Sequence, residues 1–348
     1  MKKMKFSRDK IYFDYAATTP MDPLVKKAME PYFFEKFGNP SSIHSFGQEA
    51  MAIVDESREK IANIIGASPV GGFQEIIFTG SATEANNLAL RGIIKKFRIK
   101  NLELRDPLYS KSYILNPRII VSAIEHESIL ETCRDLEKDG IEIIYLPVNK
   151  QGIVDLNKLK ESLNERTILV SVMYANNEIG TIQPISAIAE IVKEFRIKNL
   201  EFRNKKNPQS SILNPQFYPL FHTDAVQAFQ FLDCDINKLW VDLMTLSGHK
   251  IYGPKGIGLL YAKNLEFRIK DLGIKNKKIL NPQSLILLLL AAGRNSTFAR
   301  ARKMSLQLRV LAKPLSWPIK IAKKKQKEFP NFQIIFGEKS KKYFQKLR

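Results

Sequence analysis

The sequence has very few cysteines and no long apolar run. Its 348 residues include only Cys133 and Cys234, and neither has histidines or other cysteines nearby at the spacing of a metal site. This argues against a disulfide-stapled secreted domain, and we expect no metal and a reducing, cytoplasmic setting. The most apolar run, residues 285–292, is far shorter than the roughly 20 residues that span a bilayer, so we expect no transmembrane helix.

The N-terminus also lacks the features of a secretory signal. Residues 1–10 are basic, but IYFDYAATTP follows where a signal peptide would have its apolar core. The composition, with 44% hydrophobic and 26% charged residues, is that of a folded globular protein. At this length we expect one large domain or two unequal ones.

The net charge is +20, with 55 Lys and Arg against 35 Asp and Glu, which by itself favours a nucleic-acid or membrane partner. The location of the charge argues otherwise. Three similar segments beginning FRIK, residues 97–118, 195–216 and 267–283, carry +11 together, and residues 300–348 carry +13. The remaining chain is therefore slightly acidic. We expect no nucleic-acid partner, although a binder that acts through the basic segments stays open as an alternative.

The three segments are interpreted as insertions. The sequence between them is unrelated, so they are not the units of a solenoid. Each falls between a helical pattern and a strand pattern, and each contains N-P and other polar residues that favour turns. We expect surface loops or short helices.

The rest of the chain alternates between short apolar runs and amphipathic patterns. We expect strands over residues 75–78, 118–121, 141–145, 167–171, 217–222 and 243–245. We expect helices over residues 49–65, 84–95, 128–138 and 186–193. This alternation predicts an α/β fold with a mainly parallel sheet, in which ligands bind in loops at the carboxyl ends of the strands.

Three of these loops precede helices or turns. Residues 78–87, FTGSATEANN, suit a phosphate at a helix N-terminus with Thr83 as a hydroxyl donor, or an ordinary helix start capped by Ser81 or Thr83. His126, after a strand, suits ring stacking or acid/base work, or a structural role. Asn177, in YANNEIG, could orient a polar ligand or belong to an ordinary turn.

Two further loops carry a carboxylate and a lysine. Asp224 ends an apolar strand in HTDAVQ and could hold a proton on a heteroaromatic nitrogen, with Gln227 near the same ligand; the alternative is a helix N-cap. Lys250 lies in SGHKIYGPKGIG and suits a partly buried nucleophilic amine; the alternative is a glycine-rich hairpin with solvent-facing lysines. A lysine, an acid, an imidazole and a helix N-terminus together form the set that pyridoxal 5'-phosphate (PLP) requires.

At this point the sequence resembles the cysteine desulfurases, a branch of the class V aminotransferase family. The resemblance runs from Ile11 to about Ala262 once the first two insertions are set aside. The motifs that carry it are YFDYAATTP, GNPSSIHSFG, FTGSATEANNLAL, SAIEHESIL, VSVMYANNEIGTIQP, HTDAVQ and SGHKIYGPKGIGLLY. It implies PLP as cofactor and the type I PLP-dependent transferase fold.

The resemblance also implies roles for the loop residues. Lys250 would bond the cofactor covalently and His126 would stack on its ring and shuttle protons, which makes these two the catalytic residues. Asp224 would pair with the ring nitrogen, Gln227 would contact the phenolic oxygen, and Asn177 would bind the substrate carboxylate.

The cofactor phosphate would be held by a second group. Thr83, Ser247 and His249 would contact it from this chain. The family forms homodimers whose partner subunit supplies one more threonine, and the segment RNST makes Thr297 the match.

The sequence departs from the family in several places. Tyr15 stands where the family usually has Asn, Tyr174 where it often has His, and Ser296 replaces a Gly. The mobile loop with the sulfur-accepting cysteine finds no match, because Cys133 lies in a helical pattern and Cys234 in a turn. We expect both to be passive thiols. We also expect that a frameshift or truncation after about residue 297 separates the chain from its family.

The domain organisation follows from the resemblance. Residues 1–13 would form an arm of the small domain, residues 14–262 the large PLP-binding domain, and residues 263–348 a truncated or divergent part of a small α+β domain.

The implied function is a cysteine desulfurase that converts L-cysteine to L-alanine and passes the sulfur to an acceptor or to an iron–sulfur scaffold protein. Two alternatives stay open: a catalytically impaired PLP-binding homologue, and another class V lyase such as selenocysteine lyase.

Overall fold

The computed structural model describes residues 11–67, 72–103, 116–206 and 218–263. Nearly all of the expected arm and small-domain segments, the third insertion and Thr297 lie outside these residues. The division into domains therefore stays a prediction.

A seven-stranded sheet organises the described residues, and its order is β1-β7-β6-β5-β4-β2-β3. The strands are β1 (Ile76–Thr79), β2 (Arg118–Ser122), β3 (Glu142–Leu146), β4 (Thr167–Ser171), β5 (Leu220–Asp224), β6 (Leu243–Ser247) and β7 (Gly258–Ala262). Strands β6, β5, β4, β2 and β3 run parallel, and β7 pairs antiparallel with both β1 and β6. The expected mainly parallel α/β sheet is confirmed.

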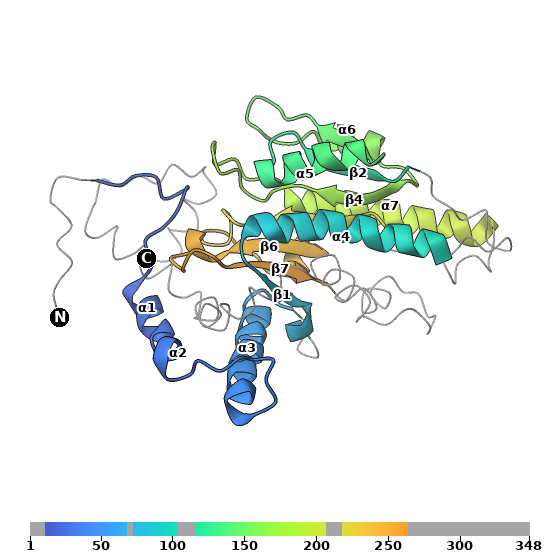
Figure 1. The fold of residues 1–348 in the computed structure, drawn as a ribbon. Coiled ribbons are helices and arrows are strands. Elements are labelled where there is room, and N and C mark those ends of the chain that lie inside the picture. The colour runs from blue at the N-terminus through green and yellow to red at the C-terminus, as the bar shows by residue number, and fades with distance from the viewer. Residues whose placement is uncertain (1–10, 68–71, 104–115, 207–217, 264–348) are drawn as a thin grey trace.

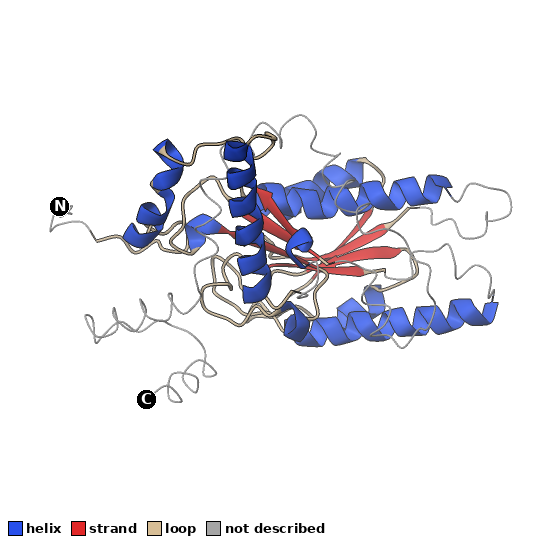
Figure 2. Cartoon of the chain, turned by 90° about the horizontal axis from the view of Figure 1, so that it is seen from below, coloured by secondary structure: helices blue, strands red, loops and turns tan. Residues whose placement is uncertain are grey.

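Helices cover both faces of the sheet (Figure 2). They are α1 (Pro23–Met29), α2 (Pro31–Phe34), α3 (Ser45–Ile64), α4 (Ala82–Glu103), α5 (Glu127–Lys138), α6 (Leu156–Ser162), α7 (Ile185–Lys206) and α8 (Ile236–Leu239). Helices α4 and α5 pack on one face, and α3, α6 and α7 pack on the other. Side chains of β2 alternate between the two cores, Ile119 toward α4 and Ile120 toward α7, as the period of a strand requires. Both faces of the sheet are therefore buried, which explains why the strands read as continuous apolar runs.

The first two FRIK segments begin inside helices. Residues 97–103 continue α4 and residues 195–206 continue α7, and both helices end on the same side of the molecule (Figure 1). Phe97 is buried, with its ring 5.7 Å from that of Tyr218 in an edge-on contact. Arg196 is buried too, and its guanidinium lies 2.5 Å from the Asp242 carboxylate. The interpretation as surface loops or short helices is wrong for these starts, because they continue long helices and each contributes one buried side chain, Phe97 or Arg196.

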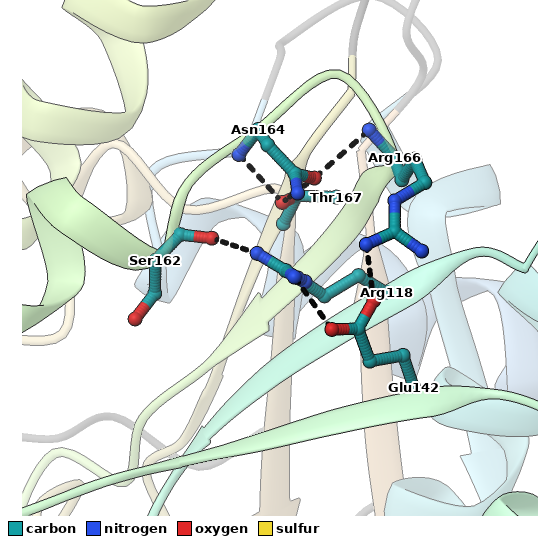
Figure 3. Close-up of polar contacts among 6 residues, drawn as sticks. All are labelled: Arg118, Glu142, Ser162, Asn164, Arg166 and Thr167. Carbon is teal, nitrogen blue, oxygen red and sulfur yellow. Dashed lines mark hydrogen bonds and ion pairs between the residues drawn. The ribbon is translucent and has the colours of Figure 1, made fainter.

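The last residue of the first segment, Arg118, is also part of the fold. As Figure 3 shows, its guanidinium donates to Glu142 at 2.5 Å and to the Ser162 carbonyl at 2.7 Å, and Arg166 contacts the other Glu142 oxygen at 2.8 Å. The hydrogen bond from Arg118 lowers the pKa of Glu142. This network fixes the amino ends of β2, β3 and β4, at the opposite end of the strands from the loops expected to carry chemistry.

The expected elements are present with shifted bounds. Helix α4 extends eight residues beyond the expected end at 95, and α7 extends well past 193, because both segments, which begin FRIKNLE, supply the helix formers Arg, Lys, Leu and Glu and no Gly or Pro at their start. The expected strand over 217–222 is instead β5 at Leu220–Asp224. No helix within the described ranges is long and apolar enough to cross a bilayer.

Candidate active site

A pocket of about 450 Å³ opens at the N-terminus of α4. Three segments far apart in the sequence line it: the residues just after Tyr15, the loop after β1, and the connection from β6 to β7. The lining residues are Ala17, Thr18, Gly80, Ser81, His249, Lys255, Gly256 and Ile257. Ala17 and Thr18, in the motif YFDYAATTP, therefore form one wall of the candidate site.

The N-terminus of α4 is built by a reciprocal cap. The Glu84 backbone N–H donates to Ser81 Oγ at 3.1 Å, and the Gly80 N–H donates to the Glu84 carboxylate at 2.7 Å. Ser81 is therefore the capping residue, while Thr83 is exposed on the first turn. Gly258 lets β7 approach this turn, because a Cβ there would lie 2.3 Å from the Ser81 carbonyl carbon.

Asp224 is buried at the carboxyl end of β5. One carboxylate oxygen accepts a hydrogen bond from the Asn86 amide at 2.8 Å, and the other accepts from the Val226 N–H at 3.0 Å. The contact to Val226 is the one an N-cap makes, but a turn follows in place of a helix. Burial raises the pKa of Asp224, and these hydrogen bonds, His126 and Lys250 oppose that rise.

A chain of hydrogen bonds joins Asp224 to His126. Asn86 donates to Asp224 and, at 2.9 Å, to Ser128 Oγ, which lies 2.8 Å from His126 Nδ1. The same Nδ1 accepts the Ser128 backbone N–H at 3.0 Å, so the ring hydrogen belongs on Nε2. Sequence reasoning missed Asn86 and Ser128. Their positions in the sequence could have indicated them, because Asn86 lies one helical turn after Thr83 and Ser128 lies two residues after His126.

Lys250 is half-buried, and its amine faces the backbone of Ala16 and Ala17. Its Nζ donates to the carbonyl oxygens of Ala16 at 2.5 Å and Ala17 at 2.9 Å, and Gln227 donates to the same Ala16 oxygen at 2.8 Å. Burial lowers the pKa of Lys250, while Asp14 and Asp224 act against this. Strands β6 and β7 pair antiparallel on either side of Lys250, so the backbone forms the hairpin of the alternative interpretation. Lys250 itself does not point freely into solvent, because its amine is hydrogen-bonded to two carbonyl groups.

His249 lines the pocket, and Ser247, two residues before it, ends β6. His249 Nδ1 is 3.1 Å from Thr18 Oγ1, and its carbonyl accepts two hydrogen bonds from Thr19. Burial lowers the pKa of His249, and the nearby Lys250 and Lys255 lower it further. Ser247 Oγ is buried and has no hydrogen-bond partner among the described residues.

The structure therefore brings most of the predicted residues to one edge of the sheet. Asp224 and His126 are linked through Asn86 and Ser128, while Lys250 and Gln227 share Ala16. Their roles stay predictions, as do those of the other assigned residues: exposed Thr83 on α4, Ser247, His249, half-buried Asn177 in the loop after β4, and Thr297 outside the described residues.

Both cysteines are buried thiols that stay protonated near neutral pH. Cys133 is fully buried on α5 and Cys234 is 6% exposed. Burial raises the pKa of each thiol to about 12. The described residues agree with the expectation of passive thiols.

The residues at this edge fit PLP on two observations. The hydrogen-bond donors on Asp224 are neutral, so a protonated ring nitrogen would supply the positive charge that the buried carboxylate lacks. The orphaned Ser247 Oγ beside the α4 N-terminus suits a phosphate oxygen. No cluster of three potential metal-ligating side chains occurs among the described residues.

Comparison with known proteins agrees with this chemistry. The sequence is 44% identical over 253 residues to the cysteine desulfurase IscS of Dictyoglomus turgidum, which covers 73% of this chain and 54% of that protein. It is 45% identical over 254 residues to the putative cysteine desulfurase IscS 1 of Bacillus subtilis, which covers 73% of this chain and 56% of that protein. The chain thus spans about half the length of the curated relatives it matches.

Solved structures agree on the fold, and the expected type I fold is confirmed. A NifS-like protein superposes with a TM-score of 0.65 at 31% identity, covering 91% of this chain and 73% of that one. A structure of SspA in complex with cysteine gives 0.59 at 32% identity, covering 82% and 73%. The family model "Aminotransferase class-V" matches residues 11–199 and 216–274. The protein therefore belongs to the class V aminotransferase family, whose members depend on PLP.

Proposed function

We propose that this chain binds PLP at Lys250 and acts on L-cysteine as a cysteine desulfurase, yielding L-alanine and passing the sulfur to an acceptor. The observation that carries the proposal is buried Asp224, held by neutral donors at the edge of the sheet that also carries Lys250 and His126. The similarity to cysteine desulfurases, and to a protein solved in complex with cysteine, supports the choice of substrate.

The roles of the side chains follow from their contacts. PLP, when bound, withdraws electrons from the α-carbon of an attached amino acid. The lowered pKa of Lys250 favours the neutral amine that bonds a carbonyl and later accepts a proton at Nζ. Asp224 would hold a proton on the ring nitrogen. His126, with its Nδ1 occupied by Ser128, would present its Nε2 hydrogen and the ring face.

The ends of the bound molecules would be held by other groups. The α4 N-terminus, Ser247 and His249 supply donors for the phosphate, with Thr83 on the first turn and Thr297 of a partner copy as further donors. Gln227, fixed by the Ala16 carbonyl, keeps a second N–H for the phenolic oxygen. Asn177 would bind the substrate carboxylate.

The sulfur acceptor would be a thiol other than Cys133 or Cys234, because both are buried with raised pKa values. A thiol of an iron–sulfur scaffold protein is the partner that the IscS relatives suggest. The same observation favours a second candidate function, a PLP-binding homologue that binds cysteine without releasing sulfide. We also propose a cytoplasmic setting, which suits two free thiols.

A homodimer is part of the proposal. Five large apolar side chains between α2 and the start of α3 are at least half exposed: Phe33, Phe34, Phe37, Ile43 and Phe46. An exposed apolar surface of this kind is typical of a protein interface, and a second copy of the chain would cover it. Sedimentation of the purified protein at several concentrations measures this.

The test is purification with PLP followed by assays for alanine and sulfide from cysteine. We expect a yellow protein whose colour is lost in Lys250→Ala and kept in Lys158→Ala, an exposed lysine on α6. Cysteine-dependent alanine with an added thiol would support the desulfurase. Colour without alanine would favour the second candidate, activity on selenocysteine alone would favour a lyase, and a wild-type protein that binds no PLP would contradict the proposal.

A further inference from the structure

Glu125 is a buried carboxyl between two loops of the candidate site. It is 5% exposed, and its Oε1 accepts two hydrogen bonds of 2.6 Å, one from Ser122 Oγ and one from the Met173 backbone N–H. Ser122 ends β2, and Met173 lies just beyond the end of the neighbouring strand β4. A single carboxyl oxygen therefore joins the carboxyl ends of two adjacent strands.

The loops that leave these strands carry the predicted ligand contacts. His126 follows Glu125 directly, and Asn177 lies four residues after Met173. A second link runs between the same loops, because the Asn176 amide donates to the Ile124 carbonyl at 2.9 Å. Asn176 Oδ1 in turn accepts the backbone N–H groups of Glu178 and Ile179, which shape its own loop. The two loops are thus tied twice, once through the Glu125 side chain and once through the Ile124 carbonyl.

We propose that Glu125 is a positioning residue, which holds the loop of His126 against the loop of Asn177 so that both side chains face one ligand. This inference rests on the proposed function for the identity of that ligand. Among the described residues, Glu125 hydrogen-bonds to Ser122 and Met173, so it acts through the backbone of Met173 and the hydroxyl of Ser122.

Glu125 acts as a neutral acid. Burial, with a smaller contribution from Asp224 on β5, raises its pKa to about 8, although the hydrogen bonds from Ser122 and Met173 oppose the rise. Glu125 in turn contributes to the raised pKa of the Cys133 thiol on α5. Glu125 Oε2 is buried without a hydrogen-bond partner among the described residues, where a proton costs less than a charge. Glutamine has the same shape, keeps Oε1 as an acceptor and is neutral at every pH.

Amide hydrogen exchange of the full-length protein without added cofactor tests the positioning directly. We compare the wild type with Glu125→Ala, Glu125→Gln and a matched control, Glu131→Gln, which makes the same change at an exposed site on α5. In Glu125→Ala we expect the peptides over 122–128 and 172–178 to exchange about tenfold faster or more, as the loss of one buried hydrogen bond implies. The Glu131→Gln protein should match the wild type at pH 7, and the Glu125→Gln protein should exchange no faster than the wild type.

Three results would overturn the inference: unchanged loops in Glu125→Ala, a uniform increase over the whole chain, or Glu125→Gln behaving like Glu125→Ala. PLP affinity, measured by fluorescence quenching, then separates the two proposals. A wild-type protein that binds no PLP refutes the proposed function and leaves the exchange result standing. If the wild type binds PLP, Glu125→Ala should weaken binding and Glu125→Gln should restore it; equal affinity in all three would refute the positioning role.

Discussion

Replacing Glu125 with glutamine should make the protein more stable than the wild type at neutral and alkaline pH. In the folded protein the pKa of Glu125 is raised to about 8, whereas in the unfolded chain it has its ordinary value near 4.5. Between these values the folded protein keeps a proton that the unfolded chain releases. The free energy of unfolding therefore falls as the pH rises through this window, and a glutamine removes that fall.

The magnitude follows from the width of the window. Well inside it, one proton bound only in the folded state costs about 1.4 kcal/mol of stability per pH unit. Across the whole window of about 3.5 pH units the difference between Glu125→Gln and the wild type should grow to at most about 5 kcal/mol, and local relaxation that admits water would make it smaller. Below pH 4.5 and above pH 8 the difference should be constant.

Urea denaturation at half-unit steps from pH 4.5 to 9 measures this difference, with Glu131→Gln as the control for a change of surface charge. The control should run parallel to the wild type, since exposed ion pairs contribute little. A Glu125→Gln curve parallel to the wild type across the window would refute the reasoning, because it would mean that Glu125 is already ionised in the folded protein at low pH.

Four further outcomes follow from the packing and the thiols. Phe97→Ala should lower the free energy of unfolding by about 3 to 4 kcal/mol in urea denaturation, because the FRIK segment begins in the core; a loss under 1 kcal/mol would mean that the segment is peripheral. Arg196→Met should cost about 3 to 5 kcal/mol by leaving Asp242 charged and buried, and a neutral effect would contradict the pairing. Gly258→Ala should lower the thermal midpoint well below that of Gly140→Ala, because the new Cβ at 258 would collide with the Ser81 backbone, whereas the Cβ at 140 meets nothing and only its φ of +80° is unfavourable. Cys133 and Cys234 should react with a thiol reagent at pH 8 only after denaturation, and rapid labelling of the native protein would show that one is accessible.

The sequence predicted the sheet because its strands are buried on both faces. Residues 167–171 form β4 as expected, since a short apolar run, residues 168–170, bounded by the polar Thr167 and Ser171 is typical of a strand buried on both faces. The ends of α4 and α7 could not be predicted in this way. The repeated FRIK residues look like inserted sequence, yet Phe97 and Arg196 acquire their roles only from Tyr218 and Asp242, which are distant in the chain.

The candidate site residues that could be predicted are those that lie next to a strand in the sequence. Asp224, His126 and Lys250 each follow or precede a strand, and parallel strands bring such loops to one edge. Contacts between distant segments could not be predicted. Lys250 donates to the backbone carbonyls of Ala16 and Ala17, and Glu125 accepts the backbone N–H of Met173. Every residue type has these backbone groups, so the pattern of side chains does not reveal such contacts.

The covalent attachment of PLP to Lys250 is the most direct test of the account. The purified chain is incubated with PLP, reduced with borohydride, digested and mapped by mass spectrometry. We predict one pyridoxyl group on the peptide that contains Lys250, and its absence in Lys250→Ala. A label on other lysines with Lys250 unmodified, or no label, would contradict the assignment of this edge of the sheet as a PLP site.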